Sequence, residues 1–97
     1  MDEAEVRQHA QSHGDAVVAG DLQSAGAVLT PEAVAQAGGV MRLLPRPATT
    51  AEVTAVEPTS EGWRATIRYA GDGGDVVVES LWEERDGAAR IVDLRVP

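Results

Sequence analysis

The stretch that decides the fold is WRATIRYA, residues 63–70. Apolar residues alternate in it with arginine and threonine, and this period of two is typical of a half-buried β-strand. One face carries Trp63, Ala65, Ile67 and Tyr69, and the opposite face carries Arg64, Thr66 and Arg68. Such a strand needs neighbours in a sheet and another layer of structure over its apolar face.

The period of two continues on both sides of this stretch, interrupted by turns that contain glycine or proline. These turns lie at Pro58–Gly62, Gly71–Gly74 and Asp86-Gly87. The sequence therefore predicts a curved, three- to four-stranded antiparallel sheet, with strands at about residues 50–57, 63–70, 75–84 and 89–96.

The last predicted hairpin allows two registers. A two-residue Asp86-Gly87 turn would pair Trp82 with Ile91, whereas a three-residue turn over residues 85–87 would pair Trp82 with Arg90. A shift of one residue moves every side chain to the other face of the sheet. We expect the second register, because it gathers one apolar face that consists of Trp63, Ala65, Ile67, Tyr69, Val76, Val78, Trp82, Val92, Leu94 and Val96.

The expected register leaves an apolar group on the far face of the sheet. Val77, Leu81 and Ile91 would lie there among charged residues that include Arg64 and Arg68. An apolar patch ringed by charge is typical of a subunit interface, and it would make the protein a homodimer. Scattered exposed valine and leucine residues, which need no explanation, are the alternative.

The residues before position 48 carry the signals of helices instead. Asp2, Asp21 and Thr30 are N-cap residues, and each precedes a segment with helical spacing of apolar residues. Helices are predicted at about residues 3–19, 22–29 and 31–37, with Gly38-Gly39 ending the third. Residues 40–44 fit either a helical turn or a short buried strand. We expect one α+β domain, residues 1–97, with the N-terminal helices packed on one face of the sheet.

The composition limits the function. The formal net charge is −8, and there is no lysine or cysteine. A negative chain repels phosphate groups, which argues against nucleic acids and anionic membranes as partners. Disulfides and thiolate metal sites are excluded. No motif implies a cofactor, and no signal or membrane-spanning run is visible, so we expect a cytoplasmic protein.

Two histidines on the first predicted helix are candidate functional residues. His9 and His13 are four residues apart and form half of a metal site at most, because no third ligand follows at a suitable spacing. His13 falls on the apolar face of the helix and is a natural proton carrier near neutral pH. Tyr69 could stand across from it. A histidine at the edge of the core, with one hydrogen bond, is the alternative.

The aromatic residues of the apolar face are the other candidates. Trp63 and Trp82 could line a ligand pocket between helices and sheet, together with Tyr69 and His13, or they could be ordinary core residues.

Two segments resemble a known family. The first helix, followed by Gly20-Asp21-Leu22 and a second short helix, resembles the opening of the nuclear transport factor 2-like superfamily, also called SnoaL-like or cystatin-like. The segment LWEERDGAARIVDL, residues 81–94, is similar to the last hairpin of that group. The resemblance covers roughly residues 4–30 and 76–96, and the chain would be a shortened member.

This resemblance implies a curved antiparallel sheet wrapped around helices to form a cone with an open mouth. Members include isomerases, cyclases and dehydratases of small molecules, and also non-catalytic binding and dimerisation domains. Catalytic members place a histidine or an aspartate inside the cone, often with a tyrosine. His13 and Tyr69 are the positions of this chain that the resemblance points to.

No catalytic motif is complete in the sequence, and the short passage from helices to sheet argues against a deep pocket. We therefore expect a non-catalytic domain for dimerisation, or for binding a small apolar ligand or a protein partner. The alternative is a small enzyme that acts on a hydrophobic substrate, with proton transfer by His13 or an acid.

Overall fold

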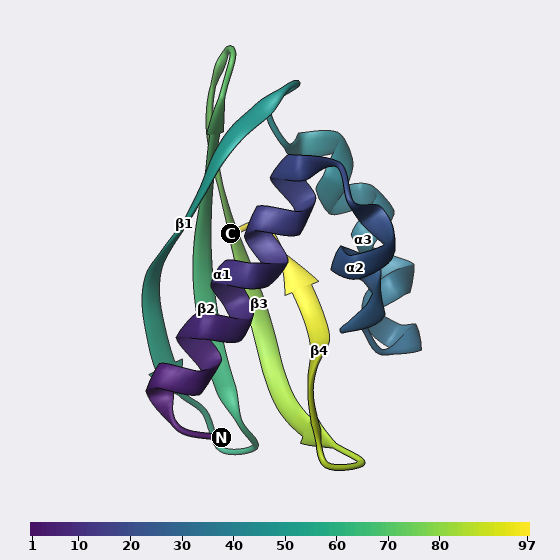
Figure 1. Cartoon of the computed structure of the whole chain (residues 1–97), viewed down its shortest axis with the longest axis vertical. Coiled ribbons are helices and arrows are strands. Elements are labelled where there is room, and N and C mark those ends of the chain that lie inside the picture. Colours follow the sequence, from purple (N-terminus) through teal and green to yellow (C-terminus); the bar gives the residue numbers. More distant parts are fainter.

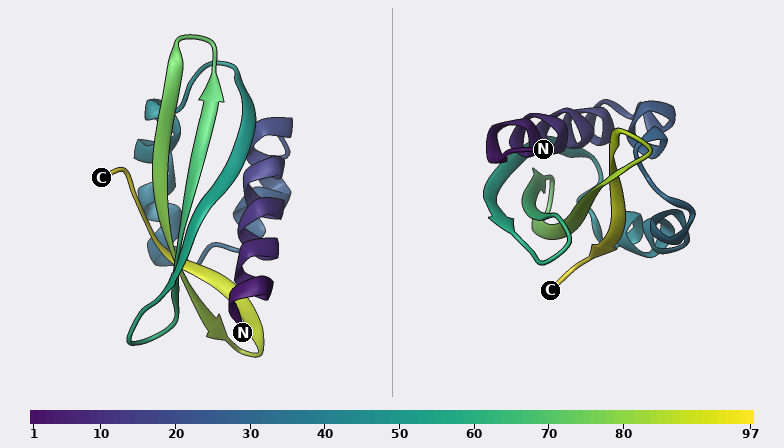
Figure 2. Two further views of the ribbon diagram at one scale, coloured as in Figure 1. Left: turned by 90° about the vertical axis from the view of Figure 1, so that its left-hand side faces the viewer. Right: turned by 90° about the horizontal axis from the view of Figure 1, so that it is seen from below.

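The structure, a computed structural model, describes all residues from Met1 to Pro97. Three helices pack on one face of a four-stranded antiparallel sheet, as the sequence predicted, and the sheet is visibly curved (Figures 1 and 2). The strands follow one another in the order β1-β2-β3-β4. The elements are α1 (Glu3–Ala19), α2 (Leu22–Ala27), α3 (Pro31–Leu43), β1 (Ala48–Pro58), β2 (Trp63–Gly71), β3 (Gly74–Arg85) and β4 (Ala88–Arg95).

Each helix begins at the predicted N-cap. The side chains of Asp2, Asp21 and Thr30 each accept a hydrogen bond from a backbone N–H in the first turn, at 2.9, 3.2 and 3.4 Å respectively. Helix α1 ends at Gly20, whose φ of 76° lies in the left-handed region that glycine adopts without steric cost. None of the three helices is long and apolar enough to cross a bilayer.

Helix α3 is longer than predicted. It continues through Gly38-Gly39 to Leu43, so residues 40–43 are helical and the predicted end at residue 37 was wrong. A glycine lowers helix propensity by about 1 kcal/mol relative to alanine but does not forbid the helix. Val40 and Met41 pack against the core, and this packing outweighs the weak local preference. Leu44 is the C-cap of the helix; it precedes a proline and its backbone is extended.

The β3–β4 hairpin has the two-residue turn, and the predicted three-residue turn was wrong. Asp86 and Gly87 both have positive φ, 54° and 77°, as a type I′ turn requires. Trp82 accordingly pairs with Ile91. Asparagine, aspartate and glycine tolerate this backbone best, so the local turn chemistry prevailed over the apolar pattern.

A β-bulge then resolves the conflict between the turn and the apolar pattern. It inserts Val92 into β4, so that Trp82 pairs with Ile91 and Ser80 pairs with Leu94. The extra residue lets Ile91 and Leu94 both face the helices, although they are three positions apart. The predicted inward position of Val92 was wrong, and this residue is half-buried.

The core lies between the helices and the predicted apolar face of the sheet. Its centre is Trp82, which is fully buried and whose Nε1–H donates to Ser80 Oγ at 3.0 Å. That hydroxyl donates in turn to the carbonyl oxygen of Ala65, also at 3.0 Å, so the buried serine is satisfied. The buried cluster consists of Val6, Ala10, Ala33, Leu44, Val53, Val56, Ala65, Ile67, Tyr69, Val78, Trp82, Ile91 and Leu94.

Gly14 sets the distance between α1 and the sheet. A Cβ atom at this position would lie 2.9 Å from Ala51 Cβ and 3.4 Å from Ile67 Cγ2. Only glycine therefore allows this approach, which compensates for its low helix propensity.

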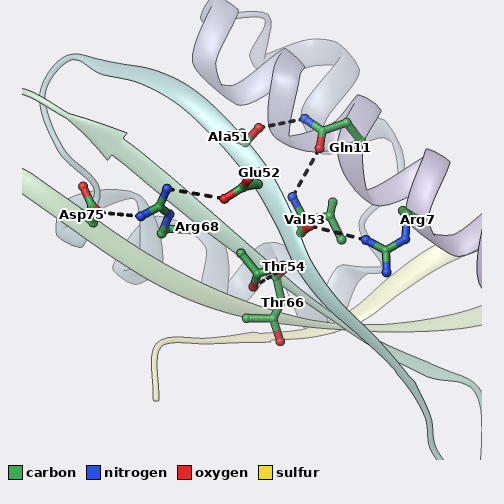
Figure 3. A network of polar contacts seen from close by, with 9 residues as sticks. All are labelled: Arg7, Gln11, Ala51, Glu52, Val53, Thr54, Thr66, Arg68 and Asp75. Atoms are coloured by element: carbon green, nitrogen blue, oxygen red, sulfur yellow. Dashed lines mark hydrogen bonds and ion pairs between the residues drawn. The ribbon is translucent and has the colours of Figure 1, made fainter.

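The free edge of β1 is covered by side chains of α1. Gln11 Nε2 donates to the carbonyl oxygen of Ala51 at 2.8 Å, and Gln11 Oε1 accepts from the N–H of Val53 at 3.3 Å (Figure 3). Arg7 Nη1 donates to the carbonyl oxygen of Val53 at 3.4 Å. The primary amide of Gln11 thus pairs with the edge as a neighbouring strand would.

The free edge of β4 is covered in a similar way. The backbone of Ile91 pairs with the link between α2 and α3, donating to the carbonyl oxygen of Val28 at 2.7 Å and accepting from the N–H of Thr30 at 2.9 Å. Gln36 Oε1 accepts from the N–H of Leu94 at 2.8 Å. Both edges of the sheet are therefore tied to the helical layer.

Candidate functional site

An apolar cavity of about 270 Å³ lies between the three helices and the sheet. Its walls come from α1, α2, α3 and the inner sides of β2, β3 and β4, and twelve of the fifteen lining residues are hydrophobic. They are His13, Val17, Leu22, Ala25, Gly26, Leu29, Val34, Ala37, Gly38, Val40, Met41, Leu44, Tyr69, Val78 and Leu94.

Two large apolar side chains mark the mouth of the cavity. Leu22 at the start of α2 and Val34 in α3 both line it, yet they are 58% and 55% exposed. Because these side chains contact both the cavity and the solvent, the opening of the cavity lies between α2 and α3.

Two glycines enlarge the cavity. A Cβ atom at Gly26 of α2 or at Gly38 of α3 would meet no atom within 4 Å, so neither glycine is required by close packing. Both residues line the cavity, and their missing side chains leave volume there. The sequence pattern had assigned Gly38 to a helix break, and its position on a cavity wall was not foreseen.

His13 is one of two polar side chains that line the cavity, and it is 9% exposed. Its Nδ1 lies 3.1 Å from the carbonyl oxygen of Ala25, an acceptor at the end of α2. Because a carbonyl oxygen only accepts hydrogen bonds, Nδ1 carries the proton and donates it. Burial lowers the pKa of His13 below 6.5, and the bond to Ala25 offsets part of this effect.

Tyr69 is the second polar side chain of the cavity and is 3% exposed. Burial raises the pKa of its hydroxyl, and the negative charge of Asp15 raises this pKa further. No hydrogen bond joins the hydroxyl to the protein, and the same holds for Nε2 of His13. The only fully buried polar side-chain atom without a partner is Nε of Arg64, so the two cavity groups retain some exposed surface.

The structure thus brings His13 and Tyr69 to one cavity but leaves the two tryptophans out of it. Trp82 lies in the core, where the ring of His9 stacks on it at 6.2 Å and the ring of His13 meets it edge-on at 6.4 Å. Trp63 is half-buried and pairs with Trp82 across the β2–β3 ladder. Of the two interpretations of these tryptophans, Trp82 follows the ordinary core one, because α1 covers it directly, and neither tryptophan lines this cavity.

The far face of the sheet carries most of the predicted interface residues. Val77 is 38% exposed, and Leu81 is half-buried. Arg68 bridges two acids, Glu52 at 3.4 Å and Asp75 at 3.1 Å, as Figure 3 shows. Arg64 pairs with Glu57 at 3.3 Å.

Ile91 does not belong to this face. The two-residue turn directs it toward the helices, where it is fully buried. Its assignment to an interface was therefore wrong, since it followed from the wrong register.

Histidine, aspartate and glutamate side chains do not gather in groups of three that could hold a metal ion. His9, the other half of the possible metal pair, is exposed and stacks on Trp82.

Comparison of the chain with protein-family models, with curated proteins and with solved structures gave no match.

Proposed function

We propose that this chain is a small ligand-binding domain that holds an apolar molecule between its helices and its sheet. The observation that carries the proposal is the cavity of about 270 Å³ with predominantly hydrophobic walls. Ligand sites are typically concave and apolar, with a few polar groups that orient the ligand. His13 and Tyr69 supply such groups.

We further propose that the chain belongs to the nuclear transport factor 2-like superfamily. The order of elements, the curved sheet and the apolar cavity on its helix-bearing side support this assignment. A fold by itself does not supply a function, so the ligand-binding proposal depends on the cavity alone.

Binding is favoured over catalysis by the composition of the cavity walls. No aspartate or glutamate lines the cavity, so His13 has no carboxylate there to orient it or to share a proton. The lowered pKa of His13 also makes it a weaker base.

One observation favours the alternative, an enzyme of the isomerase, cyclase or dehydratase type. Nε2 of His13 is free to accept a proton from a bound molecule. A proton-transfer enzyme would exchange hydrogen at an acidic C–H of its ligand in heavy water. Mass spectrometry of a recovered cyclic ketone would detect that exchange, and an unchanged isotope pattern would count against the enzyme.

A pair of glycine variants tests the binding proposal. Gly38→Leu adds a side chain at a residue that lines the cavity, whereas Gly39→Leu adds one at the next position, which does not line it. Both variants gain helix propensity, so they are matched in local stability. We expect isothermal titration calorimetry to detect binding of indane, a compact apolar molecule, to the wild type and to Gly39→Leu but not to Gly38→Leu. Equal binding by the two variants would place the ligand elsewhere and contradict the proposal.

A second candidate function is self-association of two copies through the far face of the sheet. The exposed Val77 lies there among side chains of both signs, including Arg64, Arg68, Glu52 and Glu57. A twofold interface brings the same patch of each copy together, so it requires complementary charges within one patch. Light scattering coupled to size exclusion tests this proposal, and a monomeric mass at tens of micromolar would contradict it.

A further inference from the structure

We propose that the cavity selects a neutral molecule that carries one hydroxyl group, which exchanges hydrogen bonds with Tyr69 and His13. This inference rests on the proposed ligand-binding function and adds the chemical class of the ligand.

The acceptor for such a hydroxyl is Nε2 of His13. The proton of the neutral imidazole sits on Nδ1, where it is donated to the carbonyl oxygen of Ala25 at 3.1 Å. Nε2 therefore presents a lone pair and makes no hydrogen bond within the protein. Burial keeps the ring uncharged near neutral pH, because it lowers the pKa of His13.

The donor is the hydroxyl of Tyr69. This side chain is 3% exposed and lines the same cavity, yet its hydroxyl has no hydrogen-bond partner in the protein. The hydroxyl retains some exposed surface and can be hydrated in the free protein, so a ligand that displaces this hydration has to supply the hydrogen bond, since an unpaired hydroxyl in an apolar cavity is costly. A ligand hydroxyl satisfies both needs, because it accepts from Tyr69 and donates to His13, whereas a ketone or an ether leaves Nε2 of His13 without a donor.

The composition of the cavity walls disfavours charged ligands. No lysine, arginine, aspartate or glutamate is among the lining residues, so an ion would lose its hydration without gaining a counter-charge. Anions meet an additional barrier in Asp15, whose charge acts on Tyr69, and in the net charge of −8. A carboxylate ligand is thus disfavoured.

The cavity volume limits the size of the molecule. About 270 Å³ lies just below the range of about 300–1,000 Å³ that is typical of small-molecule sites. The mouth between Leu22 and Val34 is apolar, so a compact molecule of one or two rings suits the site.

The test compares three molecules of one shape: indane, indanol and indane carboxylate, with the substituent on the five-membered ring. Calorimetry on the wild type should show indanol binding about tenfold more tightly than indane, because indane leaves both polar groups unpaired. Indane carboxylate should bind least.

Two variants identify the groups responsible. Tyr69→Phe removes only the hydroxyl, and His13→Asn keeps a donor for the Ala25 carbonyl oxygen but removes the acceptor at Nε2. Each should reduce the preference for indanol over indane to about threefold or less, since each removes one of two hydrogen bonds. A general loss of packing would weaken both ligands alike and leave their ratio unchanged, so the ratio separates recognition from stability. Should one variant fail to fold, the ratio in the other decides.

The outcomes also separate the two proposals. Equal affinity of the wild type for indane and indanol would overturn the hydroxyl selectivity but leave the binding domain in place. Preference for the carboxylate would likewise overturn it. No binding of any of the three would overturn both proposals.

Discussion

At the scale of single residues, His13 is a titratable side chain that is buried in the folded protein. Its ring lies under α2, with a hydrogen bond to the carbonyl oxygen of Ala25, and burial lowers its pKa. The folded protein therefore takes up a proton on His13 at a lower pH than the unfolded chain does, and this difference links folding to pH.

Acidification through the range in which His13 titrates destabilises the folded protein. Above pH 6.5 His13 is neutral in both states and does not affect stability. As the pH falls below 6.5, the unfolded chain gains the proton first, so stability is lost down to the lowered pKa of the folded state. Asp21 and Glu32, whose pKa values are lowered from 3.8 and 4.5 by hydrogen bonds, act only in a more acidic range.

We expect the urea midpoint of the wild type to fall between about pH 7 and about pH 5, because of this proton uptake. His13→Asn cannot titrate in that range, and its midpoint should change less over the same interval. A wild-type midpoint that rises on acidification, or an unchanged slope in the variant, would contradict the burial of a neutral His13.

At the scale of elements, side-chain amides close the two edges of the sheet. Exposed edges invite pairing with other chains, and proteins usually protect them. Gln11 covers β1 by two hydrogen bonds to backbone groups, whereas Gln36 covers β4 by one. The role of Gln11 is not visible in the sequence, where it is an ordinary polar residue of an amphipathic helix.

Gln11→Ala should therefore lower the free energy of unfolding by about 1–2 kcal/mol, since it leaves two edge groups without their partner. Gln8→Ala is the matched control, because Gln8 is an exposed residue of the same helix, and it should change stability by less than about 0.5 kcal/mol. Urea unfolding of both variants measures the difference. Equal stabilities would show that the amide of Gln11 contributes nothing to the edge.

The elements also show where sequence reasoning works. The alternation in residues 63–70 correctly assigns β2 and its two faces. The hydrophobicity of each residue is enough to indicate whether its side chain faces the core. The β3–β4 register was missed because it depends on a bulge at Val92, and no local pattern marks a bulge. The length of α3 was missed because Val40 and Met41 are held by tertiary packing.

At the scale of the whole molecule, the cavity and the far face are separate surfaces, and a separate function is proposed for each. The cavity opens between α2 and α3, and Val77 pairs with Arg68 on the opposite face of the sheet. Figures 1 and 2 show the three helices on one face of the sheet only. A dimer through the far face would therefore leave the mouth of the cavity open.

Val77→Arg should convert the proposed dimer into a monomer, because it places like charges opposite each other across the twofold axis. Leu43→Arg is the control, since Leu43 is 57% exposed and lies on α3 instead. Light scattering should give the mass of two chains for the wild type and the control and the mass of one for Val77→Arg. A dimer that survives in Val77→Arg would place the interface elsewhere.

The sequence predicts the two polar residues of the candidate site but not the cavity, because the cavity depends on tertiary structure. His13 and Tyr69 were identifiable because each is a polar residue on an apolar face. The cavity itself is formed by residues of all three helices and three strands, and its volume depends on Gly26 and Gly38. A glycine adds cavity volume only where the neighbouring elements leave an unfilled space, and the sequence does not predict the position of such a space.

The hydrogen bonds that join β4 to the α2–α3 link and to α3 affect the order in which the protein folds. Gln36 and Leu94 are 58 residues apart in sequence, and Thr30 and Ile91 are joined over a comparable separation. Contacts over such separations form late, because the entropy of closing the intervening loop has to be overcome first. The second and third helices leave the ribosome early, but they reach their final packed position only when the last strand has formed.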